Sequence, residues 1–562
     1  MLLATLALGA NPAQAYVALM AGQQARPLVG TFNTVPVLHS NQPEEVQGAG
    51  ILVSTMEGQS YSTEINQFLY NATYTFKGEF GLHIHHKYYP IGSAWNGPGG
   101  RRHELTLAAI MVNPSDQTVT VQLDQGSVRN SFEAPYLPNN LMGVKPLGPR
   151  PWNTGPGDAT AIAMLRGKLD NNLPDRIVIP PRGRTVLFQT QLPSNGIANG
   201  LLRGRSDGPI QVAVVAVREP RNDNDVFAVL DGGKLAPGRT YLRRLRDIEA
   251  GYVFSRVAGV AIGDAYQASL NYDLNDGPLH VPLTSTVRHN FGTGEIQVNP
   301  LASRMVDSSI NNVGTYGVRF DINLNLKGQG PYELVLSHPS PNGRAFTAFR
   351  GSIGITTDSG YREVHVGLRS GQSLSLAALE LNPGQNNRVR VSLVYPADAT
   401  PGHLLSVVPS SQLARVQEQL KLLAIAQSRP GRPAARPNQL PLPVLELNAI
   451  ATDNPNPLGL DTIAPAPSPK PRVKTPLAKA SVKPKPQVAK LPAKPSGASS
   501  HLRLDPLALQ ALSPLPPAPG PVEWQGPGPV VISPARMSQS LMDRYQQALE
   551  NQQLVIKSLG GR

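Results

Sequence analysis

The chain has 562 residues, of which 55 are proline, 52 are glycine and none is cysteine, and its formal net charge is +13. The lack of cysteine excludes a disulfide framework, thiol catalysis, cysteine-containing zinc sites and a lipid-modified cysteine anchor. A chain of this length can bury a core without disulfides and has room for several domains of roughly 100–200 residues each.

Residues 1–15 have the pattern of a truncated signal peptide. Leu2–Ala10 form an apolar run, and Ala13-Gln14-Ala15 offers the small-residue pattern of a cleavage site. The positively charged segment that opens a signal is missing, so we expect the true translation start to lie upstream; the alternative is an ordinary apolar strand. The run is shorter than the ~20 residues that cross a bilayer. We therefore expect an exported protein of the periplasm or outer envelope with no transmembrane span.

The segment 28–408 consists of short β-type runs separated by Gly, Pro, Asn and Asp. The turn Asn113-Pro114-Ser115-Asp116 between two β-branched runs predicts a hairpin, because proline presets φ and the Asn and Asp side chains bond the nearby backbone. Short strands at this spacing favour sandwiches or Greek-key barrels. The predicted fold class is all-β, with two sandwich-like or Greek-key β-domains and a largely disordered Pro/Lys-rich C-terminal tail that carries short helices.

Two halves of this segment share an order of patterns: a hairpin, a Leu/Phe-Arg-Gly strand, and a Pro/Gly turn that leads into an alternating strand. The paired pieces are VNPSDQTVTVQL (112–123) and LNLKGQGPYELVLS (324–337), AMLRGKL (163–169) and TAFRGSI (347–353), and IPPRGRTVLFQTQLP (179–193) and LNPGQNNRVRVSLVYP (381–396). We predict two related β-domains, 28–220 and 251–408, joined by a polar connector, 221–250. The alternative is that all sandwiches repeat such compositions, since the spacings differ.

The character of the chain changes after residue 408. Residues 409–428 are predicted to form an amphipathic helix, because an apolar stripe repeats at helical spacing, at Leu413, Val416, Leu420 and Leu423. Residues 429–535 read as a disordered linker and 536–560 as a C-terminal helix that ends before Gly560-Gly561. Between 464 and 500 there are nine prolines, eight Lys or Arg and no acidic residue.

A family resemblance covers residues 28–408. The chain resembles an exported family of uncharacterised cyanobacterial proteins, and the motifs are turns and strand edges rather than a catalytic signature. They are FNTVPVLHSNQPEEVQGAGILVSTM (32–56), VNPSDQTVTVQLDQGS (112–127), MLRGKLDN, RSDGPIQVAVVA (205–216), GYVFSRVAGVAIGDAYQ (251–267), FGTGEIQVNPL (291–301) and VSLVYPADATPGHLLSV (391–407). The resemblance implies export and modular construction and transfers no site residue.

The sharpest local cluster is GLHIHHKYYP (81–90). On a strand, His83 and His85 share a face and His86 points the other way. Two imidazoles on one face suit Zn²⁺ or Cu²⁺ if a third ligand arrives, and His103 and Glu104 are the nearest candidates. The alternative is a surface histidine cluster beside Lys87 and two tyrosines.

The tail is the most basic part of the chain. Outside the cytoplasm such a segment meets anionic envelope polymers, and without aromatic residues it is poorly suited to nucleic acid. We predict contact with an anionic cell-envelope polymer or envelope protein, and no nucleic acid, through Lys470, Arg472, Lys474, Lys479, Lys483, Lys485, Lys490 and Lys494. The alternative is a solvated linker that contacts nothing.

Catalytic templates are missing from the sequence. Neither a G-x-S-x-G elbow, nor H-E-x-x-H, nor a Walker loop, nor G-x-G-x-x-G occurs. We therefore expect a non-enzymatic, cofactor-free envelope protein that binds or scaffolds through its β-domains. The alternative is an exported carbohydrate-active or metal-binding protein that uses the region of His83 and His85.

Overall fold

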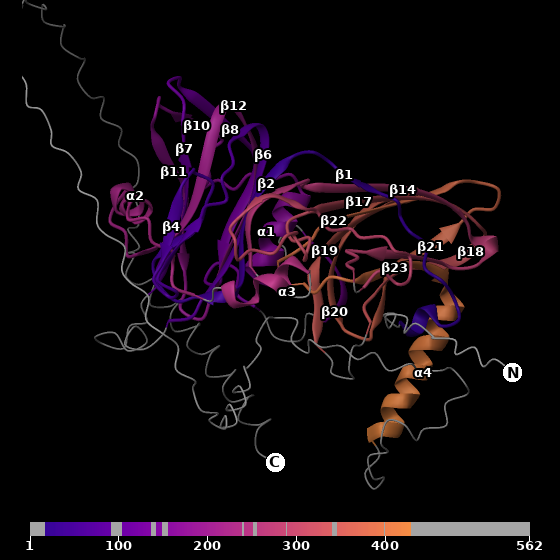
Figure 1. Ribbon diagram of the computed structural model, residues 1–562. Helices are drawn as coiled ribbons and strands as arrows, with labels where there is room; N and C mark the ends of the chain where they lie inside the picture. Colours follow the sequence, from indigo (N-terminus) through magenta and orange to yellow (C-terminus); the bar gives the residue numbers. More distant parts are fainter. Residues whose placement is uncertain are drawn as a thin grey trace, which may run out of the picture. The chain divides into compact units, whose positions relative to one another are not determined.

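The computed structural model describes residues 17–90, 104–136, 142–148, 155–238, 241–250, 256–287, 289–339, 346–397 and 399–428 (Figure 1). The predicted signal peptide (1–15), linker (429–535) and C-terminal helix (536–560) lie outside these residues, and so do the eight basic residues of the tail. The described residues are mostly strands in several sheets, which confirms the predicted all-β class.

Strands and a few short helices follow one another along the described part of the chain. They are η1 (Ala18–Met20), β1 (Thr31–Phe32), β2 (Pro36–Val46), β3 (Gly50–Ser54), β4 (Gln59–Ser62), β5 (Gln67–Tyr70), β6 (Phe76–Tyr88), β7 (Leu105–Val112), β8 (Val119–Asn130), β9 (Gly143–Pro146), α1 (Pro156–Leu165), β10 (Arg176–Ile179), β11 (Arg184–Leu192), β12 (Ile197–Arg218), α2 (Asp223–Asp231), η5 (Leu242–Arg244), α3 (Leu245–Glu249), β13 (Val257–Ile262), β14 (Ala265–Asp273), η6 (Leu274–Asp276), β15 (Leu279–Leu283), β16 (Leu301–Arg304), β17 (Arg319–Lys327), β18 (Gly330–Ser337), β19 (Thr347–Thr357), β20 (Gly360–Arg369), β21 (Ser373–Leu381), β22 (Asn387–Val394), β23 (His403–Pro409) and α4 (Ser410–Ser428).

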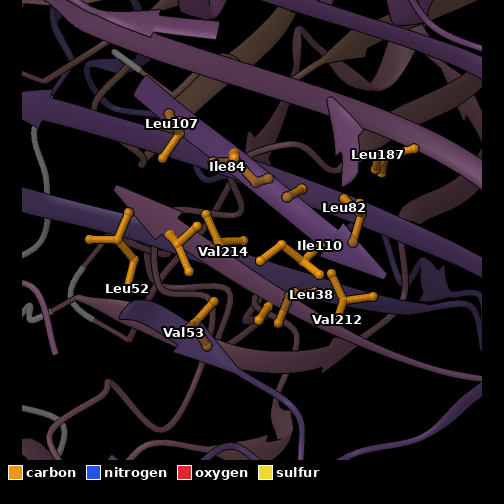
Figure 2. Packing of buried hydrophobic residues seen from close by; sticks show 14 of the residues in the cluster. Leu38, Leu52, Val53, Leu82, Ile84, Leu107, Ile110, Leu187, Val212 and Val214 are labelled. Atoms are coloured by element: carbon orange, nitrogen blue, oxygen red, sulfur yellow. The ribbon is translucent and has the colours of Figure 1, made fainter. Parts of the chain in front are cut away.

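Two sandwiches make up the body of the protein. In the first sandwich, one layer has the strand order β10-β8-β12-β6-β2-β13-β16. The facing layer consists of β11, β7 and β3, and it belongs to the same sheet because β7 and β3 pair with the C-terminal part of β12. In the second, the seven-stranded sheet β1-β14-β17-β22-β19-β20-β9 faces the four-stranded sheet β15-β23-β18-β21. A separate two-stranded sheet, β4-β5, lies on the first sandwich. Each sandwich encloses its own hydrophobic core, and Figure 2 shows part of the first, with Leu38, Leu82, Ile110 and Val214 among its members.

The 22-residue strand β12 turns the corner between the two layers of the first sandwich. Its part up to Ser206 pairs with β6 and β8, whereas residues from Gln211 onward pair with β7. The bend needs glycine, since a Cβ at Gly208 would lie 2.5 Å from Val119 Cγ2. Strands that change layer in this way close the end of a sandwich.

The predicted hairpin at Asn113–Asp116 was wrong. The local turn chemistry is present, because Asn113 Oδ1 accepts the Ser115 amide at 2.9 Å. However, β7 pairs with β11 and the far part of β12, whereas β8 pairs with β10 and the near part of β12. The turn is therefore an arch that crosses from one layer to the other. Asn113 Nδ2 donates to the carbonyls of Ile179 and Pro180, which ties this arch to a second one, between β10 and β11.

The second sandwich repeats this pair of stacked arches. The β17–β18 and β21–β22 connections both cross between layers, with β17 paired to β22 and β18 paired to β21. Asn387 Nδ2 donates to Leu326 O at 3.2 Å and so joins the two arches, as Asn113 does in the first sandwich. The first and third pieces of the sequence repeat correspond to these arches, so the hairpin predicted at 324–337 was also wrong. The middle pieces differ, because Met164–Leu165 end helix α1 and Phe349 lies on strand β19.

Strands from each side of the predicted connector, 221–250, join a sheet of the sandwich on the other side. β13 and β16 join the first sandwich, and β1 and β9 join the second. All described residues fall within one compact unit. The segment predicted as connector contains α2 and α3, and Val226 of α2 lies in the first core. Whether 28–220 and 251–408 fold independently stays a prediction.

Helix α1 is wedged between the two sandwiches. Its buried face joins Leu201 of β12 to Val394 of β22 through Ala161, Ile162 and Leu165. Arg166, just past the helix, pairs with Glu363 of β20 at 2.5 Å. Helix α1, which follows β9 and precedes β10 in the sequence, therefore joins the first sandwich to the second.

Helix α4 occupies the segment predicted to be helical. Leu413 is buried beside Leu19 of η1, and Val416 packs against the same cluster, whereas Leu420 is exposed. Leu413 and Val416 of the stripe are thus covered, and Leu420 is not. Within the described parts of the chain, no helix is long and apolar enough to cross a membrane.

Candidate functional site

His83, His85 and His86 lie on β6, a central strand that is covered on both faces. Their exposed fractions are 1, 8 and 2%. β6 runs between β2, which is parallel to it, and β12, which is antiparallel. The three histidines therefore belong to the core, and the alternative of a surface cluster was wrong for them.

His83 contacts a histidine that sequence reasoning missed. The parallel register of β2 and β6 places His39 opposite His83, and their Nδ1 atoms lie 3.1 Å apart. Burial lowers the pKa of His39 to about 3, and burial and then the neighbouring histidines lower the pKa of His83 well below its usual value. Both rings are neutral at pH 7, so one Nδ1–H donates to the other Nδ1.

The other two histidines have different partners. His85 Nδ1 lies 2.9 Å from Asn199 Oδ1, and the Asn199 amide donates to Thr160 of α1. His86 Nε2 lies 2.7 Å from Ser40 Oγ on β2. Burial lowers the pKa of His86 well below its usual value. As predicted, His83 and His85 share one face of β6, and His86 lies on the other. The three side chains belong to separate hydrogen-bond networks, which join β6 to β2 and, through Asn199, to β12 and α1.

A metal at His83 and His85 stays a prediction. Within the described residues, no three His, Cys, Asp or Glu side chains form a group that holds a metal ion. Of the two proposed third ligands, His103 lies outside the described residues. Glu104 has its pKa raised by burial and by the nearby carboxylate of Glu219.

A column of buried rings links this cluster to the second sandwich. His83 lies 6.4 Å from Tyr316, measured between ring centroids, and Tyr316 stacks on Tyr395 at 5.9 Å. Tyr395 in turn lies 5.9 Å from His403, which contacts His338 at 5.0 Å. Each sandwich thus holds a pair of histidines in edge contact, and the two tyrosines connect the pairs.

The second pair of histidines is also neutral. Burial lowers the pKa of His338 to about 4 and that of His403 well below its usual value. The Tyr395 hydroxyl lies 3.4 Å from His403 Nδ1, and the Thr284 hydroxyl lies 3.3 Å from the same atom. Local sequence carried no signal for this arrangement, because its members come from turns and strand ends far apart in the chain.

A small pocket opens where the sandwiches meet beside His83. Its polar lining consists of His83, Gln125, Arg203, Asp264 and Arg319. Arg203 Nε pairs with Asp264 at 3.2 Å, and Arg319 pairs with Asp321 at 2.7 Å, so both guanidinium groups are already neutralised.

Gly317 makes the pocket wall fit against His83. It has φ +76°, and a Cβ there would lie 2.9 Å from Leu201 Cδ2 and 3.2 Å from His83 Cγ. An imidazole whose pKa is so far depressed is a weak base at neutral pH. His83 is therefore poorly suited to accept a proton in this pocket.

A comparison with protein families shows to which family the chain belongs. A family model described as "Protein of unknown function (DUF3370)" matches residues 23–409. The chain belongs to this family. The match includes every strand from β1 to β23, together with both histidine pairs and the pocket, and it ends one residue before α4.

The other comparisons add no activity. No curated protein matches the chain. Among solved structures, a tryptophan-to-tyrosine variant of oxalate decarboxylase from Bacillus subtilis is 9% identical over 71% of this chain and 85% of that one, with a TM-score of 0.09. A TM-score this low supports no statement about fold or chemistry.

Proposed function

We propose that the chain is an exported, non-enzymatic protein of the cell envelope. Its β-rich part binds or scaffolds, and its basic tail attaches it to an anionic envelope polymer. The observation that carries the non-enzymatic part is the state of the histidines: the best candidates for chemistry are buried and bonded to neighbouring strands, and burial lowers the pKa of His83 and His86 well below the usual value.

The tail supports the attachment. Between residues 464 and 500 it carries eight basic and no acidic residues. Each basic side chain near an anionic surface contributes about 1 kcal/mol before salt screens it. From its proline content we expect this segment to be extended, which would let its charges reach a polymer at a distance from the β-rich part.

The test is envelope retention in the native cell. One variant lacks residues 464–500, and a second keeps every proline but replaces the eight basic residues by Gln. We expect both to be released at low salt, and the wild type to be released only as salt is raised. Retention of both variants at low salt contradicts the tether. Fractionation of the same cells checks export, and a cytoplasmic wild type contradicts it.

One distance favours the alternative, a metal-binding protein. Two imidazole nitrogens on one tetrahedral Zn²⁺ lie roughly 3.3 Å apart, close to the 3.1 Å between the Nδ1 atoms of His39 and His83. Chelation followed by Zn²⁺ titration checks this candidate. A rise in the melting temperature that His83→Asn abolishes supports it, and an unchanged melting temperature removes its support.

A further inference from the structure

The small hairpin β4–β5 presents aromatic rings to solvent. Tyr61 pairs with Phe68 and Gln59 with Tyr70, so these four side chains share the outer face. Phe68 is 63% exposed and Tyr70 is 70% exposed, whereas Leu69 between them is buried in the first core. Two large aromatic side chains left this open on one strand face mark a binding surface.

The hairpin is held in place along its β4 edge. The Tyr61 amide donates to Gly233 O at 2.7 Å, and the Leu235 amide donates to Tyr61 O at 2.9 Å. The Tyr61 hydroxyl donates to Asn66 in the turn, and the rings of Tyr61 and Phe68 lie 5.1 Å apart. The outer face is therefore arranged before any ligand arrives, which lowers the entropic cost of binding.

We propose that Gln59, Tyr61, Phe68 and Tyr70 form a stacking surface for a neutral polysaccharide. A pyranose ring has an apolar C–H face that packs on aromatic rings and hydroxyl edges that bond amides. The hairpin supplies both, since Gln59 faces Tyr70 and the exposed residue Asn66 follows at the turn. This inference rests on the proposed function, because it names what the β-rich part binds in the envelope and where.

The size of the face argues against a folded protein as its partner. A stable protein interface uses about 20–30 residues on each side, whereas the outer face of the hairpin has four in its paired positions. Two or three sugar units match that footprint.

The charges argue against a membrane or an acidic polymer. Around the face, Lys234 is in register with Tyr61, and Glu57 and Glu64 are exposed beside the strands, so both signs are present. An anionic surface would call for a cluster of basic residues. The face is thus distinct in chemistry from the basic tail.

The experiment is calorimetric titration of the full chain with cellohexaose, laminarihexaose and maltohexaose, at a salt concentration that screens the tail. We expect at least one of these glycans to bind, and Phe68→Ala and Tyr70→Ala each to weaken that binding about tenfold or more. Phe68→Tyr keeps the ring and should stay within about threefold of wild type. The matched control is Val178→Ala, a residue 54% exposed on β10, which should change nothing.

Each result has a definite reading. Absence of binding to all three glycans overturns the inference, and so does binding that both alanine variants retain. Unfolding is excluded as a cause if the variants keep the wild-type melting temperature and circular dichroism.

The variant lacking residues 464–500 separates this inference from the tether. If it stays in the envelope while Tyr70→Ala loses the glycan, the tether fails and the stacking surface stands. If it leaves the envelope while both alanine variants bind as wild type, the stacking surface fails and the tether stands.

Discussion

The Nδ1 atoms of His39 and His83 meet at 3.1 Å between two parallel strands, on the face opposite Leu38 and Leu82 of the first core. A neutral hydrogen bond holds them, and a proton added to either ring would place a charge where no water reaches it. The position of this pair gives the protein a defined response to acid.

Acid should destabilise the fold. The pKa of His39 is lowered from 6.5 to about 3 in the folded state, and those of His280 and His338 to about 4. Below pH 6.5 these histidines bind protons in the unfolded chain but not in the folded chain. The stability that they contribute above pH 6.5 is therefore lost as the pH falls toward their folded-state pKa values. At pH 5 each such histidine should cost about 2 kcal/mol.

Urea unfolding at pH 7 and pH 5 measures this loss. His39→Asn should lower stability at pH 7 but reduce the difference between the two pH values. A free energy of unfolding that is unchanged, or higher, at pH 5 would contradict the assignment of neutral buried rings.

The buried ion pair of Arg256 and Asp307 should be costly to break. Arg256 Nη2 lies 2.7 Å from Asp307 Oδ1, and the guanidinium also donates to Leu52 O at 3.0 Å. Asp307→Asn leaves a buried positive charge without its counterion and should lower the free energy of unfolding by about 3–5 kcal/mol. The control is the exposed pair Arg182–Asp116, where Asp116→Asn should have little effect.

The asparagines that join the arches should be equally important in the two sandwiches. Asn113→Ala removes the donor that joins its arch to Ile179 O and Pro180 O, and Asn387→Ala removes the donor to Leu326 O. Leaving buried carbonyls unpaired should cost about 1–3 kcal/mol at each site in urea unfolding. Asn325→Ala, which breaks an exposed bond to Asn271, is the control. A large loss at only one of the two sites would argue that the arches are not equivalent.

Gly317 should tolerate no side chain. Gly317→Ala combines a positive φ with overlap against Leu201 and His83, whereas Gly22→Ala meets the same φ, +74° against +76°, with nothing within 4 Å. The variant at Gly22 should lose only the roughly 1–2 kcal/mol of the left-handed conformation. The variant at Gly317 should lose more, and its melting temperature should fall further. Equal losses would show that the overlap relaxes freely.

Local pattern was enough to predict strands, turn chemistry and the shared face of His83 and His85. Alternation and Asx bonding depend on a few neighbouring residues, and these were present. The same pattern could not tell a hairpin from an arch at Asn113, because that choice depends on which strands the two flanking runs pair with. The pairing is decided by β10, β11 and β12, which lie more than 60 residues further along the chain.

The partners of the histidines were out of reach for the same reason. His39 is 44 residues from His83, and a parallel pairing leaves no local trace. Tyr316 comes from a turn-rich stretch with no strand period. Sequence therefore predicted which residues are unusual but not which ones they contact.

The exchange of strands between the sandwiches limits which recombinant fragments of the protein can fold alone. β9, from the first half of the chain, completes the edge of the second sandwich at β20, and β13, from the second half, covers β2 in the first. A recombinant fragment that ends at residue 220 would leave the backbone edge of β2 bare, and its β9 would have no acceptor. Open edges of this kind recruit the missing strand from another molecule, so two such fragments would complete each other as a swapped dimer or aggregate.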